Sequence, residues 1–111
     1  MSSNTTDKRS GKRLKRELIV GVKMKSETKM AYTIDLSRGG VKVGSPLLLL
    51  QPGDVVELIV KKEGESIPFT GLVARQDGVY YLNRIGKSVI AFFIRIADAR
   101  FSKFVMDNYY V

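Results

Sequence analysis

Two short groups of residues carry side chains suited to binding a phosphorylated, hydrogen-bonding ligand. Arg9 and Arg13 are separated by three residues, and Asp35 and Ser37 open the sequence Asp-Leu-Ser-Arg-Gly-Gly. A guanidinium is flat and permanently charged, so it can pair with a phosphate, stack on a base or donate two hydrogen bonds to a base edge. A carboxylate accepts from the base donors that arginine cannot serve. These residues indicate recognition of a nucleotide.

Several neighbouring residues extend the candidate site. The Ser37 hydroxyl can donate or accept, and Gly39 and Gly40 permit positive φ and close approach of the backbone to a ligand. Further phosphate contacts, each weaker as a candidate, are Lys8, Lys12, Arg38 and Arg75. A second interpretation fits the same residues: Asp35 and Ser37 are also typical of a local turn closed by the glycines. The two roles are compatible, since such a turn presents side chains outward.

The composition argues against catalysis. The chain has no cysteine and no histidine, which excludes disulfides, thiolate metal sites and the two commonest catalytic groups. The acidic residues form no suggestive cluster. We therefore expect a protein that is not an enzyme and that needs neither metal nor cofactor.

Positive charge is concentrated at the start of the chain. The net charge is +8, and residues 1–16 hold six basic side chains against the single acid Asp7. Large apolar residues are almost absent there, so residues 1–16 are predicted to form a flexible basic arm. An arm of this kind suits an anionic partner, although a solvated arm without function fits the charge equally well.

Residues 17–111 are predicted to form a single, mainly β domain. Apolar residues alternate with polar ones, and turn signals such as Gln51-Pro52-Gly53-Asp54 separate the runs. The segments that read as strands are 18–24, 30–36, 41–43, 56–61, 67–75 and 88–96, while 79–85 fits either a strand or a long hairpin arm. Helical spacing then predicts a C-terminal helix over about 97–110, capped by Asp98.

The two motifs, in this order and around these strands, resemble the paired signature of PilZ domains. The resemblance extends from Arg9 to the terminal helix and includes the Pro52-Gly53-Asp54 turn and Gly71 to Arg75; Ala91 departs from the glycine often found there. It implies a six-stranded antiparallel β-barrel that binds cyclic di-GMP as its ligand. The implied binding residues are Arg9, Arg13, Asp35, Ser37, Gly39 and Gly40, with Asp35 suited to the guanine N1–H and N2–H₂ donors.

The resulting hypothesis is a cyclic di-GMP receptor that changes conformation on binding and signals to a downstream protein in motility, adhesion or exopolysaccharide control. Two alternatives remain: a nucleic-acid-binding barrel with a basic arm, and a PilZ scaffold that binds no nucleotide. Asp35 and Ser37 beside the glycines favour the first hypothesis, and we expect no nucleic-acid partner. No stretch approaches the roughly 20 apolar residues of a membrane span, and the absence of cysteine and of an export signal predicts a cytoplasmic location.

Overall fold

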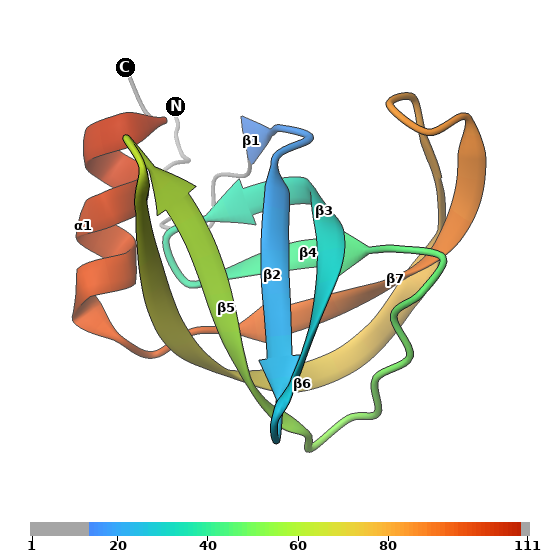
Figure 1. Ribbon diagram of the computed structural model, residues 1–111, viewed down its shortest axis with the longest axis horizontal. Helices are drawn as coiled ribbons and strands as arrows, with labels where there is room; N and C mark the ends of the chain where they lie inside the picture. Colours follow the sequence, from blue (N-terminus) through green and yellow to red (C-terminus); the bar gives the residue numbers. More distant parts are fainter. Residues whose placement is uncertain (1–13, 110–111) are drawn as a thin grey trace, which may run out of the picture.

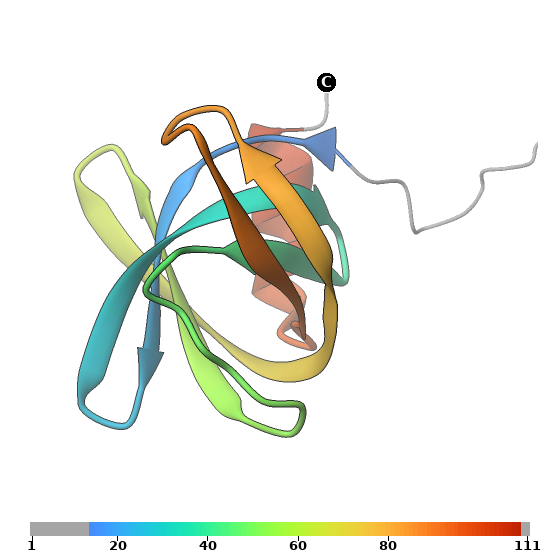
Figure 2. The ribbon, with the colours of Figure 1, turned by 90° about the vertical axis from the view of Figure 1, so that its right-hand side faces the viewer.

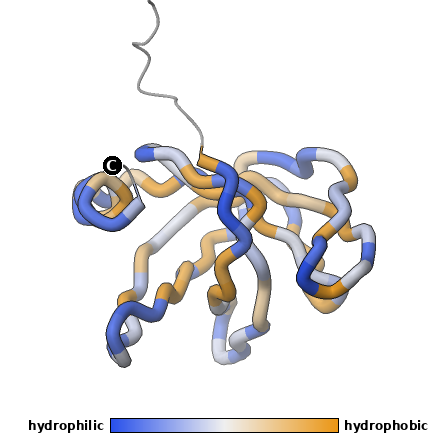
Figure 3. Tube along the Cα trace, turned by 90° about the horizontal axis from the view of Figure 1, so that it is seen from above, coloured by the Kyte–Doolittle hydropathy of each residue, from blue (hydrophilic) through white to orange (hydrophobic). Residues whose placement is uncertain are grey.

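The computed structural model describes residues 14–109, which form one antiparallel sheet and a single helix (Figure 1). Alternating apolar and polar residues produce the strands, and the alternation is visible along the chain (Figure 3). The elements are β1 (Leu14–Lys15), β2 (Ile19–Met24), β3 (Glu27–Ser37), β4 (Gly40–Gly44), β5 (Val55–Lys62), β6 (Glu65–Leu82), β7 (Lys87–Arg95) and α1 (Ala99–Asn108).

The sheet closes on itself. Its order is β1-β3-β2-β5-β6-β7-β4, and an additional pairing of β3 with β4 completes the ring. β2 pairs with Glu27 to Tyr32 of β3, and β1 pairs with Asp35 and Leu36 further along the same edge. The ring therefore has six positions, with β1 and β2 sharing one of them. The predicted antiparallel barrel with a C-terminal helix is confirmed, and the strand count differs from six only through the short β1.

A kink at residues 16–18 joins β1 to β2. The Thr33 hydroxyl donates to the carbonyl of Arg16 and accepts from the Leu18 amide at 2.9 Å. The Thr33 amide donates to the Leu18 carbonyl, also at 2.9 Å. Leu14 and Lys15, assigned to the arm from the sequence, are thus paired with the sheet. Arg16, the last residue of the expected arm, belongs to the kink, and residues 1–13 lie outside the described residues.

The barrel interior is aliphatic, and α1 packs beside the barrel. Leu58, Val41 and Ile94 are fully buried in the core, as are Phe101 and Val105 of the helix. The ring of Phe101 lies edge-on to Phe69 of β6 at 5.1 Å between centroids. Asp98 caps the helix, as predicted, by accepting from the Arg100 amide at 2.9 Å.

The β6–β7 hairpin extends beyond the rest of the ring and curls back over it (Figure 2). β6 continues to Leu82, so the segment 79–85 is a strand followed by the hairpin turn. Leu82, Val89 and Ala91 are buried yet lie outside the barrel core. The hairpin therefore buries apolar residues of its own, apart from the barrel core.

Candidate nucleotide-binding site

A β-bulge in β3 turns Asp35 out of the barrel. Thr33 pairs with Val43, and Asp35 pairs with the next residue, Lys42, so Ile34 is the extra residue of the bulge. Side chains alternate along a regular strand, so Asp35 would otherwise point inward like Thr33. Leu36 then pairs with Val41, and both belong to the core. The bulge places Asp35 on the outer face while the strand keeps its inner apolar residues.

A second bulge, in β6, places Arg75 on the outer face of the sheet. Val73 is a core residue opposite Ile94, and the register shifts before Arg75, which lies opposite Phe93. Phe93 is also the partner of Lys42. Asp35, Lys42, Phe93 and Arg75 therefore form a row across four adjacent strands, which we call the outer row. The Arg75 guanidinium lies 4.6 Å from the centre of the Phe93 ring.

Lys42 is one of the two buried charges of the outer row, and like Asp35 it has 7% of its surface exposed. Its Nζ lies 3.7 Å from Asp35 Oδ2 and 3.3 Å from Asp77 Oδ2, and it donates to the Tyr80 hydroxyl at 2.7 Å. Burial by itself lowers the pKa of an ammonium, but the Tyr80 hydroxyl and the two carboxylates outweigh it and raise the pKa of Lys42 above 10.5. Lys42 is therefore charged at neutral pH.

A cavity of about 490 Å³ opens beside Asp35. Ile34 and Asp35 form one part of its lining, Lys15 to Glu17 a second, and the hairpin residues 80–83 a third. The hairpin is held in place by Glu17, whose carboxylate accepts from the Asn83 amide at 3.3 Å and the Arg84 amide at 3.2 Å. Arg84 Nη1 also donates to the Glu17 carbonyl at 3.0 Å. Two cations, two carboxylates and two tyrosines thus line a space of the size typical for small-molecule sites, ~300–1,000 Å³.

The predicted turn at the end of β3 differs in part from expectation. Ser37 is buried, and its hydroxyl donates to the Gly40 carbonyl at 3.3 Å, so it closes the turn. Neither Gly39 nor Gly40 uses the positive φ that glycine permits. Gly40 is instead required by close packing, because a Cβ would lie 2.5 Å from the Ile94 carbonyl oxygen. Arg38 is half-exposed beside this turn.

The arginine motif ends, in the sequence, at the residue before β1. Lys8, Arg9, Lys12 and Arg13 lie outside the described residues. β1 begins at the next residue, Leu14, and pairs with Leu36 and Asp35. The chain therefore enters the fold beside the Asp35–Ser37 end of β3.

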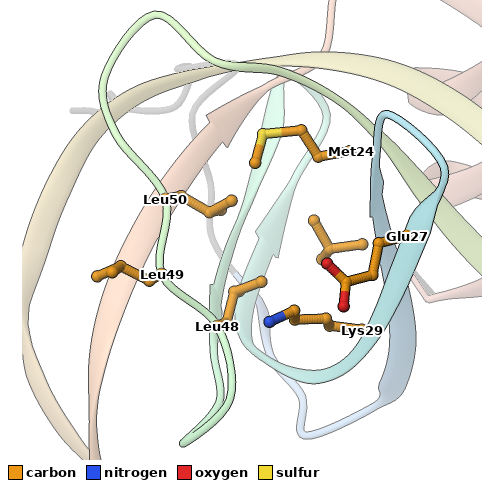
Figure 4. A pocket seen from close by; sticks show the side chains of 7 residues that line it. Met24, Glu27, Lys29, Leu48, Leu49 and Leu50 are labelled. Atoms are coloured by element: carbon orange, nitrogen blue, oxygen red, sulfur yellow. The ribbon is translucent and has the colours of Figure 1, made fainter.

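Two other cavities are less suited to a charged nucleotide. One of about 450 Å³ lies over β2, β3 and β5 and is lined mainly by apolar residues, with Lys61 as its charged group. The other, of about 110 Å³, lies between Leu48 to Leu50 and the end of β2 (Figure 4). It is smaller than typical small-molecule sites. Of these three cavities, the one beside Asp35 has both the volume and the charged residues that a nucleotide site requires.

Sequence reasoning missed Lys42, Asp77 and Phe93 as residues of the site. The signal in the sequence was Lys42 itself, a lysine between the apolar residues Val41 and Val43, which indicates an outward position. That it shares a face with Asp35 could not be inferred, because this depends on the bulge in β3. Glu17 was missed because its partners are more than 60 residues away.

Within residues 14–109, no three His, Cys, Asp or Glu side chains lie together as a metal site requires. No helix in that range is long and apolar enough to cross a bilayer.

Comparison with known proteins agrees with this geometry. The sequence model of the PilZ domain matches residues 7–97, which include both motifs and every strand of the ring. The chain belongs to the PilZ family. None of the curated protein sequences is significantly similar.

Several solved structures share the fold at low sequence identity. The Bacillus subtilis inhibitor of motility (MotI/DgrA) is 16% identical with a TM-score of 0.65, over 92% of this chain and 49% of that one. The K. pneumonia MrkH–c-di-GMP complex is 17% identical with a TM-score of 0.64, over 92% and 52%. The PilZ domain of Escherichia coli YcgR, solved with c-di-GMP, is 14% identical with a TM-score of 0.59, over 90% and 87%. This chain thus spans about half the length of the first two.

Proposed function

We propose that this PilZ domain is a cytoplasmic receptor for cyclic di-GMP that binds the nucleotide at the cavity beside Asp35 and is not an enzyme. The observation that carries the proposal is the pairing of β1 with β3, because Leu14, the residue after the arginine motif, lies opposite Leu36, between Asp35 and Ser37. The MrkH and YcgR structures, both solved with c-di-GMP, support the ligand's identity.

The chemistry of the ligand matches the residues available. Arg9 and Arg13 bind the phosphates or stack on guanine, and Lys8, Lys12 and Arg38 add positive charge. Asp35 accepts from guanine N1–H and N2–H₂, and Ser37 supplies a hydroxyl. Gly39 and Gly40 form the turn that brings these groups to the edge of the cavity. Arg75, stacked on Phe93 at the far end of the outer row, is a further cation within the same face.

Titration of the full chain with cyclic di-GMP, GTP and a short RNA tests the proposal. Cyclic di-GMP should bind most tightly. Preferred binding of RNA would support a nucleic-acid-binding barrel, and absence of binding to all three would support a scaffold.

Arg9→Ala and Arg13→Ala should each weaken cyclic di-GMP binding by about tenfold or more, because charge-assisted hydrogen bonds contribute roughly 1.5–3 kcal/mol. Lys61→Ala, which removes one positive charge from β5, is the matched control and should change affinity little. Equal losses in all three variants would indicate generic attraction.

We further propose that binding orders the segment before β1 and so creates a new surface for a downstream protein. Such a partner belongs to motility, adhesion or exopolysaccharide control. Affinity capture with the immobilised chain, with and without cyclic di-GMP, should recover that protein only with the nucleotide. The same proteins recovered in both conditions would contradict nucleotide-dependent signalling.

A further inference from the structure

Lys42 is placed where its ammonium group joins two elements of the fold. It stands opposite Asp35 of β3 in the strand register, and its other oxygen partners, Asp77 and Tyr80, come from the β6–β7 hairpin. An ammonium has three N–H donors, and three side-chain oxygen atoms lie within 3.7 Å of Lys42 Nζ. The Tyr80 ring also lies against the ammonium, with its centre 4.5 Å away.

The fold by itself gives no reason for a charge at this position. Replacing a buried ion pair by apolar residues of similar size is often neutral or stabilising, whereas removing one partner is costly. Lys42 points away from the barrel core, because Val41 and Val43 on either side of it belong to that core, and its side chain is nevertheless buried. What the charge does provide is a fixed contact to one oxygen of Asp35, with side chains of only 9% and 10% exposure.

An aspartate that recognises guanine must present its carboxylate in a defined plane, because N1–H and N2–H₂ are parallel donors. The Asp35 side chain has two rotatable bonds, and contact with a buried, immobile cation restricts both. We propose that Lys42 is a positioning residue of the nucleotide site, which orients the Asp35 carboxylate toward the cavity and is itself held by Asp77 and Tyr80. This inference rests on the proposed function.

A double-mutant cycle on the full chain tests it, with Lys42→Met, Asp35→Asn and the combined variant titrated with cyclic di-GMP and cyclic di-AMP. Lys42→Met should weaken cyclic di-GMP binding about tenfold and reduce the preference for cyclic di-GMP. In the Asp35→Asn background the same change should cost less than about twofold, since residues that act through one contact are not additive. Unchanged binding by Lys42→Met, or full additivity with Asp35→Asn, would overturn the inference.

Tyr80→Phe covers the case in which Lys42→Met fails to fold. It keeps the aromatic ring and removes the hydroxyl that holds Lys42, so cyclic di-GMP affinity and guanine preference should both fall, by a smaller factor of about two to five. Tyr109→Phe, at a half-buried tyrosine of the C-terminal region, is the control and should bind normally. Wild-type affinity and preference in Tyr80→Phe would contradict the inference. If the wild-type chain binds no cyclic di-GMP, the proposed function and the inference both fail, whereas a binding wild type with unaffected variants refutes the inference alone.

Discussion

Gly39 and Gly40 are adjacent residues of the same type with different surroundings. A Cβ at Gly40 would lie 2.5 Å from the Ile94 carbonyl oxygen and 2.6 Å from Cζ of Phe93, whereas a Cβ at Gly39 would meet nothing within 4 Å. Gly40 is therefore needed where β4 passes close to β7, on the same β7 segment that carries Phe93 of the outer row. Its place in the motif is explained by packing.

This difference gives a matched pair of variants. Gly40→Ala should lower the free energy of unfolding by about 1–3 kcal/mol, because β4 and β7 must move apart. Gly39→Ala should change it by less than about 0.5 kcal/mol, as is usual for an exposed position. Denaturant unfolding of both variants measures the two values. Equal free energies of unfolding would mean that β7 can shift away from Gly40 at little cost, which would contradict the packing explanation.

At the scale of whole elements, the strands follow from the sequence and the bulges do not. Alternation located the segments around Val20, Val56 and Val73 because one side of each faces an apolar core. The bulges at Ile34 and Ala74 arise from pairing with partners set by the closed ring, and no local residue type demands them. The motif residues could therefore be named from the sequence, but the outer row that joins Asp35 to Arg75 could not.

The hairpin also depends on a distant partner. Glu17 accepts hydrogen bonds from the amides of Asn83 and Arg84 at its turn. Glu17→Ala should raise the hydrogen exchange rates of these two amides by roughly fivefold, since each lost bond contributes about 1 kcal/mol. Exchange in the core strand β5 should not change. Glu57→Ala, on β5, is the control, and unaltered rates at the turn in Glu17→Ala would show that other contacts hold the hairpin.

At the scale of the whole molecule, the ring forms a scaffold that ends next to the arginine motif. Every strand from β2 to β7 pairs with a neighbour on each side, and β1 adds two residues to this framework. The kink at Arg16 to Leu18 is fixed by Thr33 on one side and by the hairpin contact to Glu17 on the other. If ligand binding orders the residues before Leu14, the chain that follows them is already held in place.

Limited trypsin digestion tests the ordering proposed for residues 1–13. Saturating cyclic di-GMP should reduce cleavage after Lys8, Arg9, Lys12 and Arg13 by about fivefold or more, because ordered backbone resists proteolysis. Cleavage after Lys61 and Lys87, in the barrel and hairpin, should stay the same. Protection at all sites equally would indicate global stabilisation by the ligand, and unchanged cleavage of the first segment would contradict ordering.

The bulge at Ile34 makes the site depend on strand pairing as well as on residue type. Straightening β3 at Ile34, with its length unchanged, would leave every letter of both motifs in place and still return the aspartate to the inward-facing parity of Thr33. A carboxylate there would lie against core residues, and neither the cavity nor Lys42 could reach it. Homologues that carry the motif letters on a strand of the same length without the bulge are therefore expected to have lost the nucleotide. The pairing of β3 with β4 should accordingly be weighed with the motif letters when receptors are sorted from silent relatives.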